Sequence, residues 1–83
     1  MGIEDNTKRI ENDVKKCLEV NGFEVNENSV YLMPDNAIFE MTCYATGEKD
    51  NKRYSFKMLL ASGLLKSNSN DEIIEIDITP FKS

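Results

Sequence analysis

Between residues 5 and 20 the apolar residues recur with the period of an α-helix, at Ile10, Val14, Cys17 and Leu18. Residues spaced in this way share one side of a helix, and the intervening positions are polar. Asp5 or Asn6 can cap the start, and Asn21-Gly22 provides a left-handed stop after which Phe23 can fold back on the last turn. We therefore predict an amphipathic helix that buries one face.

After the helix the period changes to two, the period of a β-strand. Four runs have this pattern, at residues 30–33, 37–46, 52–61 and 72–79. Polar and turn-forming residues separate them at 33–36, 47–51 and 66–71. The apolar residues from Phe56 to Leu64 also fit helical spacing, so the pattern does not decide whether residues 55–66 form a strand or a helix. Alternating isoleucines make the last run the clearest strand, which Pro80 should end.

One helix followed by four strands with short connections predicts an α+β fold of two layers, in the order α-β-β-β-β. The helix would pack on a four-stranded antiparallel meander sheet, and residues 1–83 would form a single small domain. The positions expected to lie under the helix are Phe39, Met41, Cys43, Tyr54, Phe56, Met58, Leu60, Ile74, Ile76 and Ile78.

Composition narrows the possible functions. The chain has 83 residues, 15 acidic and 10 basic side chains, a formal charge of -5 and no histidine. Such a chain is repelled by free nucleic acid and lacks the imidazole on which many enzymes and zinc sites depend. It has no apolar leader and no run of the length that a membrane span needs, so we expect a cytoplasmic protein without a membrane partner.

The candidates for chemistry are few. Cys17 and Cys43 occupy predicted core positions, so we expect inert packing thiols, and we expect no enzyme, cofactor or metal site. Glu75 and Asp77 share one face of the last strand and form a candidate carboxylate pair. Cross-strand ion pairs with Arg53 and Lys57 on the preceding strand explain the same residues without a function, and we prefer that explanation.

The only dense basic group lies on the predicted helix, at Lys8, Arg9, Lys15 and Lys16. Acidic residues alternate with it, with favourable i,i+4 pairs from Glu4 to Lys8 and from Glu11 to Lys15. A solvated helix face is therefore the preferred interpretation. Nucleic-acid binding through this group is the less favoured alternative.

The outer face of the predicted sheet is the most informative feature. It should carry Tyr31, Met33, Ile38, Tyr44, Leu59 and Ile73 among Glu40, Arg53, Lys57, Glu75 and Asp77. Apolar and aromatic residues with a charged rim are typical of a protein interface. The candidate partner-binding residues are Tyr31, Ile38, Glu40, Tyr44, Leu59, Ile73, Glu75 and Asp77. Alternatively, Leu64, Leu65 and Phe81 fold over this face and complete a second small core.

The sequence thus favours a small acidic cytoplasmic module for protein–protein interaction, whose partner is another protein or a second copy of itself. A homo-oligomeric accessory protein is the alternative. A sharper hypothesis is an inhibitor of a nucleic-acid-handling protein encoded by a phage or mobile element. Size, acidity and an Asn/Lys/Ile-rich composition are similar in type to those of many anti-CRISPR proteins, without a shared motif. A nucleic-acid mimic would require clustering of Glu48, Asp50, Asp71, Glu72, Glu75 and Asp77.

Overall fold

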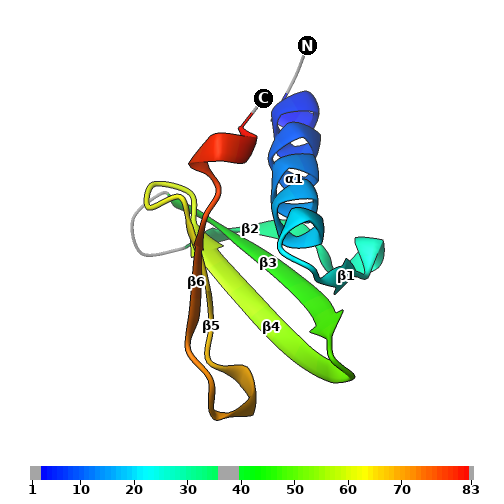
Figure 1. The fold of residues 1–83 in the computed structure, drawn as a ribbon. Coiled ribbons are helices and arrows are strands. Elements are labelled where there is room, and N and C mark those ends of the chain that lie inside the picture. Colours follow the sequence, from blue (N-terminus) through cyan, green and yellow to red (C-terminus); the bar gives the residue numbers. More distant parts are fainter. Residues whose placement is uncertain (1–2, 36–39, 83) are drawn as a thin grey trace.

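The computed structural model describes residues 3–35 and 40–82 and has one long helix on one face of an antiparallel sheet (Figure 1). This confirms the α+β class. The main elements are α1 (Ile3–Val20), β1 (Glu24–Val25), β2 (Tyr31–Asp35), β3 (Glu40–Lys49), β4 (Lys52–Leu59), β5 (Leu64–Ser67) and β6 (Ile74–Asp77). Short 3-10 helices follow three of the strands: η1 (Glu27–Ser29), η2 (Ser69–Asp71) and η3 (Thr79–Phe81).

The sheet is a meander in which β2, β3, β4, β5 and β6 each pair with the next. β1 and β2 both pair with the same edge of β3, at different positions along it. η1 connects β1 to β2. The described residues therefore form six strands instead of the predicted four.

β5 was missed because the predicted loop at 66–71 begins too early. Lys66 and Ser67 belong to β5, and the Ser67 side chain is buried. Its hydroxyl lies 3.2 Å from the Ser69 hydroxyl, so a polar side chain occupies an inward position with a partner. A four-residue strand with serine inside lacks the apolar alternation by which strands are recognised.

Two other predicted turns are shifted. β2 continues through Pro34 and Asp35, because a strand paired on one side only tolerates the missing N–H of proline. β3 continues to Lys49, and the turn is the pair Asp50-Asn51 with φ of 54° and 63°. Positive φ at both positions is the geometry of a type I′ hairpin turn. The predicted turn at 47–51 is therefore too long, and the helical alternative for residues 55–66 is wrong.

The end of α1 follows the predicted Schellman pattern. Phe23 N donates to Leu18 O at 3.0 Å and Gly22 N donates to Glu19 O at 3.0 Å, while Gly22 has φ +92°. Since glycine adopts this backbone conformation without steric cost, the chain reverses here and directs Phe23 back toward the sheet.

The core lies between α1 and the sheet. Val14, Cys17 and Leu18 are fully buried against inward-facing residues of the strands, which include Cys43, Ala45, Tyr54, Phe56, Met58 and Leu65. Every described residue that was predicted to lie under the helix is buried or packs partly buried against this core, apart from Met41, which is half-buried. Phe39 lies outside the described residues.

Phe23 extends the core beyond the helix. Its ring meets Tyr54 and Phe56 edge to face, at centroid distances of 5.4 and 5.1 Å. Gly47 leaves room for it, because a Cβ atom there would lie 3.1 Å from the Phe23 Cβ. A small residue in β3 thus allows the chain that leaves α1 to cover the sheet.

The C-terminal segment closes the other end of the same core. Ile78 is buried, and Phe81 packs partly buried against the cluster beside the first turns of α1 (Figure 1). Leu65 is fully buried on the helix side. The alternative in which Leu64, Leu65 and Phe81 together fold over the outer face is therefore wrong, since of the three only half-buried Leu64, opposite Asp77, lies on that face.

We expect Phe56→Ala to lower the free energy of unfolding by about 3–5 kcal/mol, because it leaves a cavity among Phe23, Ala45 and the helix. Ile73→Ala removes a comparable apolar side chain that is 80% exposed, and should change stability by less than about 0.5 kcal/mol. Urea denaturation followed by circular dichroism measures both. Equal effects of the two substitutions would contradict the packing described here.

Candidate functional site

Cross-strand partners on the outer face form a continuous row across five strands. Tyr31 of β2 lies opposite Tyr44 of β3, Tyr44 opposite Lys57 of β4, Lys57 opposite Lys66 of β5, and Lys66 opposite Glu75 of β6. Directly opposed residues share a face and their side chains touch. The two tyrosine rings stack, with centroids 5.2 Å apart and an interplanar angle of 25°.

A second row lies beside the first. Met33, Thr42 and Leu59 are opposed across β2, β3 and β4. Met33 is 50% exposed, Leu59 38% and Tyr31 44%, whereas Thr42 is buried between them. We call Tyr31, Met33, Tyr44 and Leu59 the outer patch.

The structure brings together only part of the predicted site. Tyr31, Tyr44 and Leu59 fall in the outer patch, and Glu75 and Asp77 lie exposed on β6 at the far side of the face. Ile73 is exposed but precedes β6 in the connection from η2, so it is not part of the sheet. Ile38 lies outside the described residues. Glu40 begins β3 opposite Asp35, and its side chain is also outside the description.

The ion pairs of the face differ from those predicted. Lys66 lies 3.5 Å from the Glu75 carboxylate, and Arg53 lies 3.8 Å from Glu48. The expected pairing of Arg53 and Lys57 with the carboxylates of the last strand is therefore wrong, because β5 separates β4 from β6. Glu75 does have a cross-strand cation, but it is Lys66 of β5.

Asp77 has a local structural role. Its Oδ1 accepts a hydrogen bond from the backbone N–H of Thr79 at 2.9 Å, and hydrogen bonding with the side chain and then the backbone of Thr79 lowers the pKa of the Asp77 carboxyl. The bond orders the turn into η3. Across residues 3–35 and 40–82 no three metal-ligating side chains gather in one place. Glu75 and Asp77 are thus held by a lysine and a backbone amide, and neither needs a metal or substrate to explain its place.

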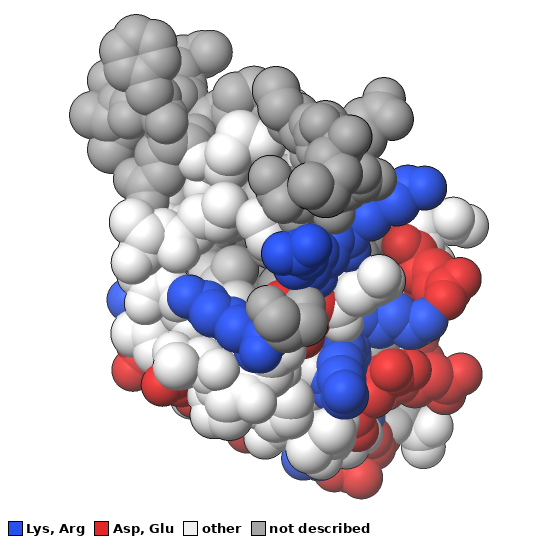
Figure 2. Space-filling model, turned by 90° about the horizontal axis from the view of Figure 1, so that it is seen from above, with Lys and Arg blue, Asp and Glu red and all other residues white. Residues whose placement is uncertain are grey.

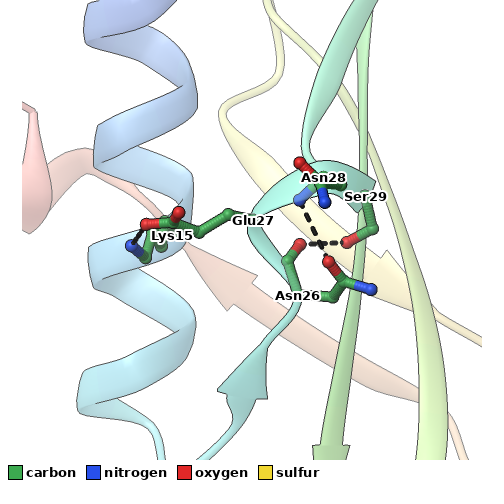
Figure 3. Close-up of polar contacts among 5 residues, drawn as sticks. All are labelled: Lys15, Asn26, Glu27, Asn28 and Ser29. Carbon is green, nitrogen blue, oxygen red and sulfur yellow. Dashed lines mark hydrogen bonds and ion pairs between the residues drawn. The ribbon is translucent and has the colours of Figure 1, made fainter.

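The basic group of the helix is partly neutralised. Lys15 forms an ion pair with Glu27 of η1, and this hydrogen bond raises the pKa of Lys15 and lowers that of Glu27 (Figure 3). Asn26 Oδ1 accepts from Asn28 N, and Ser29 Oγ donates to Asn26 O, so the turn that presents Glu27 is itself ordered. Figure 2 shows basic and acidic side chains interspersed over α1 rather than one unbroken basic surface.

The six acidic residues considered for a nucleic-acid mimic are not uniformly free. Glu48 and Glu75 are ion-paired with Arg53 and Lys66, as above. Glu72 accepts a hydrogen bond from the Tyr54 hydroxyl at 2.9 Å, which raises the pKa of Tyr54. Cations therefore lie among the carboxylates, and this weighs against a continuous anionic surface. The inhibitor hypothesis stays a prediction from sequence.

Two of the shallow hollows on the described surface are similar in volume. One, of about 440 Å³, lies beside the end of the outer face and is lined by Glu24, Val25, Asn26, Ser29, Thr46, Glu48 and Arg53. The other, of about 420 Å³, lies between α1 and the sheet and is lined by Arg9, Ile10, Asp13, Met58, Leu60, Ile78 and Lys82. Neither contains a cysteine nucleophile.

Comparison with protein-family models, with curated proteins and with solved structures finds no match for this chain. Among the described residues, α1 and the shorter helices lack the length or the apolar character that a membrane crossing requires. Function is therefore argued from the surface itself.

Both cysteines are completely buried and unpaired, as predicted from the sequence. Burial raises the pKa of Cys17, and it raises the pKa of Cys43 to about 12 from an ordinary value of 9.0. The thiols are shielded from solvent, and their raised pKa lowers the fraction of thiolate. Both effects oppose nucleophilic reactivity. Cys17 and Cys43 are packing residues.

We expect neither thiol to react with Ellman's reagent near neutral pH until the protein is unfolded. Because the folded-state pKa of Cys43 exceeds its unfolded-state value, its contribution to stability is intact below pH 9.0 and is lost as the pH rises toward about 12. Urea midpoints across this range should therefore fall less steeply for Cys43→Ala than for the wild type. Rapid labelling of the native protein would contradict the buried placement.

Proposed function

We propose that this protein is a small interaction module that binds another protein through the outer patch. The observation that carries the proposal is the exposure of Tyr31 and Met33 on β2 and of Leu59 on β4, on either side of Tyr44 and Thr42 of β3, with no other described element covering them. Isolated exposed apolar residues are common, but adjacent ones with aromatic rings are characteristic of binding surfaces.

The composition of the face supports the same proposal. Tyrosine and methionine are enriched in protein interfaces, and a charged rim surrounds an apolar centre there. The outer patch has this arrangement, since Arg53 and Glu48 lie at one end of the face and Lys66 and Glu75 toward β6. A preformed sheet also loses little conformational freedom when a partner binds.

A second copy of the chain is the other occupant considered from the sequence, and it is tested first. Light scattering over a concentration series at low and moderate salt gives the mass in solution. We expect a monomer, because the outer patch is proposed to receive a different protein. A stable dimer that Leu59→Ser disrupts would replace this proposal with self-association.

The test of partner binding uses matched exposed apolar residues. Met33→Ser and Leu59→Ser should abolish capture of the partner from extracts of the source cell, because they remove apolar contacts at the centre of the patch. Val20→Ser changes a residue that is 66% exposed at the end of α1, and should leave capture intact. Quantitative mass spectrometry of the captured proteins gives the readout.

Circular dichroism and urea midpoints confirm that each variant is folded. A protein retained by wild type and Val20→Ser but absent from both patch variants supports the proposal. If the same proteins are captured by all four forms, the outer patch is not the binding surface.

A further inference from the structure

Two lysines lie side by side at the centre of the outer face. Lys57 on β4 and Lys66 on β5 are directly opposite each other. Lys66 is 3.5 Å from Glu75, whereas Lys57 has no ion pair with any residue that the structure describes. Like charges in directly opposed positions destabilise a sheet, so this pair does not add to the stability of the fold.

Protection of a sheet edge does not account for it either. Natural sheets use lysine on edge strands to prevent pairing with other chains. β4 is an interior strand, paired with β3 along its whole length and with β5 at Lys57. An acidic chain of net charge -5 therefore keeps an unpaired cation in the middle of its sheet, next to a second cation.

Lys57 is also adjacent to the outer patch. It lies opposite Tyr44, and Leu59 is the next residue of β4 on the same face. A protein seated on the outer patch must therefore reach Lys57. Building on the function proposed above, we infer that the partner is an acidic segment of another protein, which places carboxylate side chains on Lys57 and Lys66 and apolar side chains on the outer patch.

The geometry favours a short acidic segment over nucleic acid. The positive region is confined to two neighbouring lysines, and Glu75 and Asp77 on β6 border it. A nucleic-acid backbone presents a continuous line of phosphates and would meet these carboxylates. One or two partner carboxylates can instead reach the lysine pair without passing them.

The first experiment titrates isotopically labelled protein with a synthetic copolymer of glutamate and tyrosine and follows the backbone amides by NMR. Shifts are expected at Tyr44, Lys57 and Lys66, with an affinity that falls as salt increases. A copolymer of lysine and tyrosine and a single-stranded oligothymidylate serve as comparison probes. Tighter binding of oligothymidylate would overturn the inference in favour of nucleic acid, and tighter binding of the basic copolymer would overturn it outright.

Substitutions at Lys57 and at a control lysine distinguish an effect of the charge at position 57 from an effect of the net charge of the protein. Lys57→Glu should weaken binding of the acidic copolymer on the order of tenfold, and Lys57→Arg should restore it. Lys52→Glu is a matched control, because Lys52 also faces a lysine, Lys49, but on the opposite face of the same strand. It should change the affinity by less than about twofold, as expected for a charge distant from the contact.

Stability provides a second readout. Since a carboxylate at position 57 would face Lys66, Lys57→Glu should keep or raise the urea midpoint while binding is lost. A lowered midpoint with unchanged binding would show that Lys57 serves the fold, and would overturn the inference. If Leu59→Ser abolishes capture of the cellular partner and Lys57→Glu does not, the proposed function stands and the acidic partner is wrong. If neither variant affects capture, both fail.

Discussion

The contact between one face of α1 and one face of the sheet holds this small protein together. Val14, Cys17 and Leu18 form the helical side of that contact, and the strands contribute alternating inward residues such as Phe56 and Met58. A domain of this size buries a smaller share of its surface than a large one, so it has too few residues to form a second core on the other face. Tyr31, Met33 and Leu59 therefore stay exposed on the outer face.

The same constraint explains which features were predictable. Strong periodic patterns, in α1 and in β3 and β4, identify the buried faces because each element has only one. The Schellman ending was also predictable, because glycine and a following apolar residue determine it locally. β5 was not, since its inward residue Ser67 is polar, and the hydroxyl of Ser69 two residues later satisfies it, so the strand lacks the apolar alternation that marks a buried face.

The absence of β5 from the prediction changed the candidate site. If β4 and β6 were neighbours, Lys57 would face the carboxylates of the last strand, and ion pairing would explain its position. With β5 in place, Glu75 pairs with Lys66, and Lys57 has a lysine as its neighbour. The alternation of apolar and polar residues was enough to propose the residues of the outer patch. The electrostatic character of the face depends instead on the order of the strands in the sheet, which this alternation does not specify.

The meander has a consequence for how the chain reaches this structure. From β2 to β6 every pairing joins strands that are consecutive in the sequence, so each hairpin closes a short loop. The contacts of α1 are different, because Cys17 meets the carbonyl of Asp77, 60 residues away. We therefore expect the hairpins to assemble early, and the contacts of α1 with the C-terminal segment to form last, so that Cys17 is fully enclosed only when Asp77 and η3 are in place.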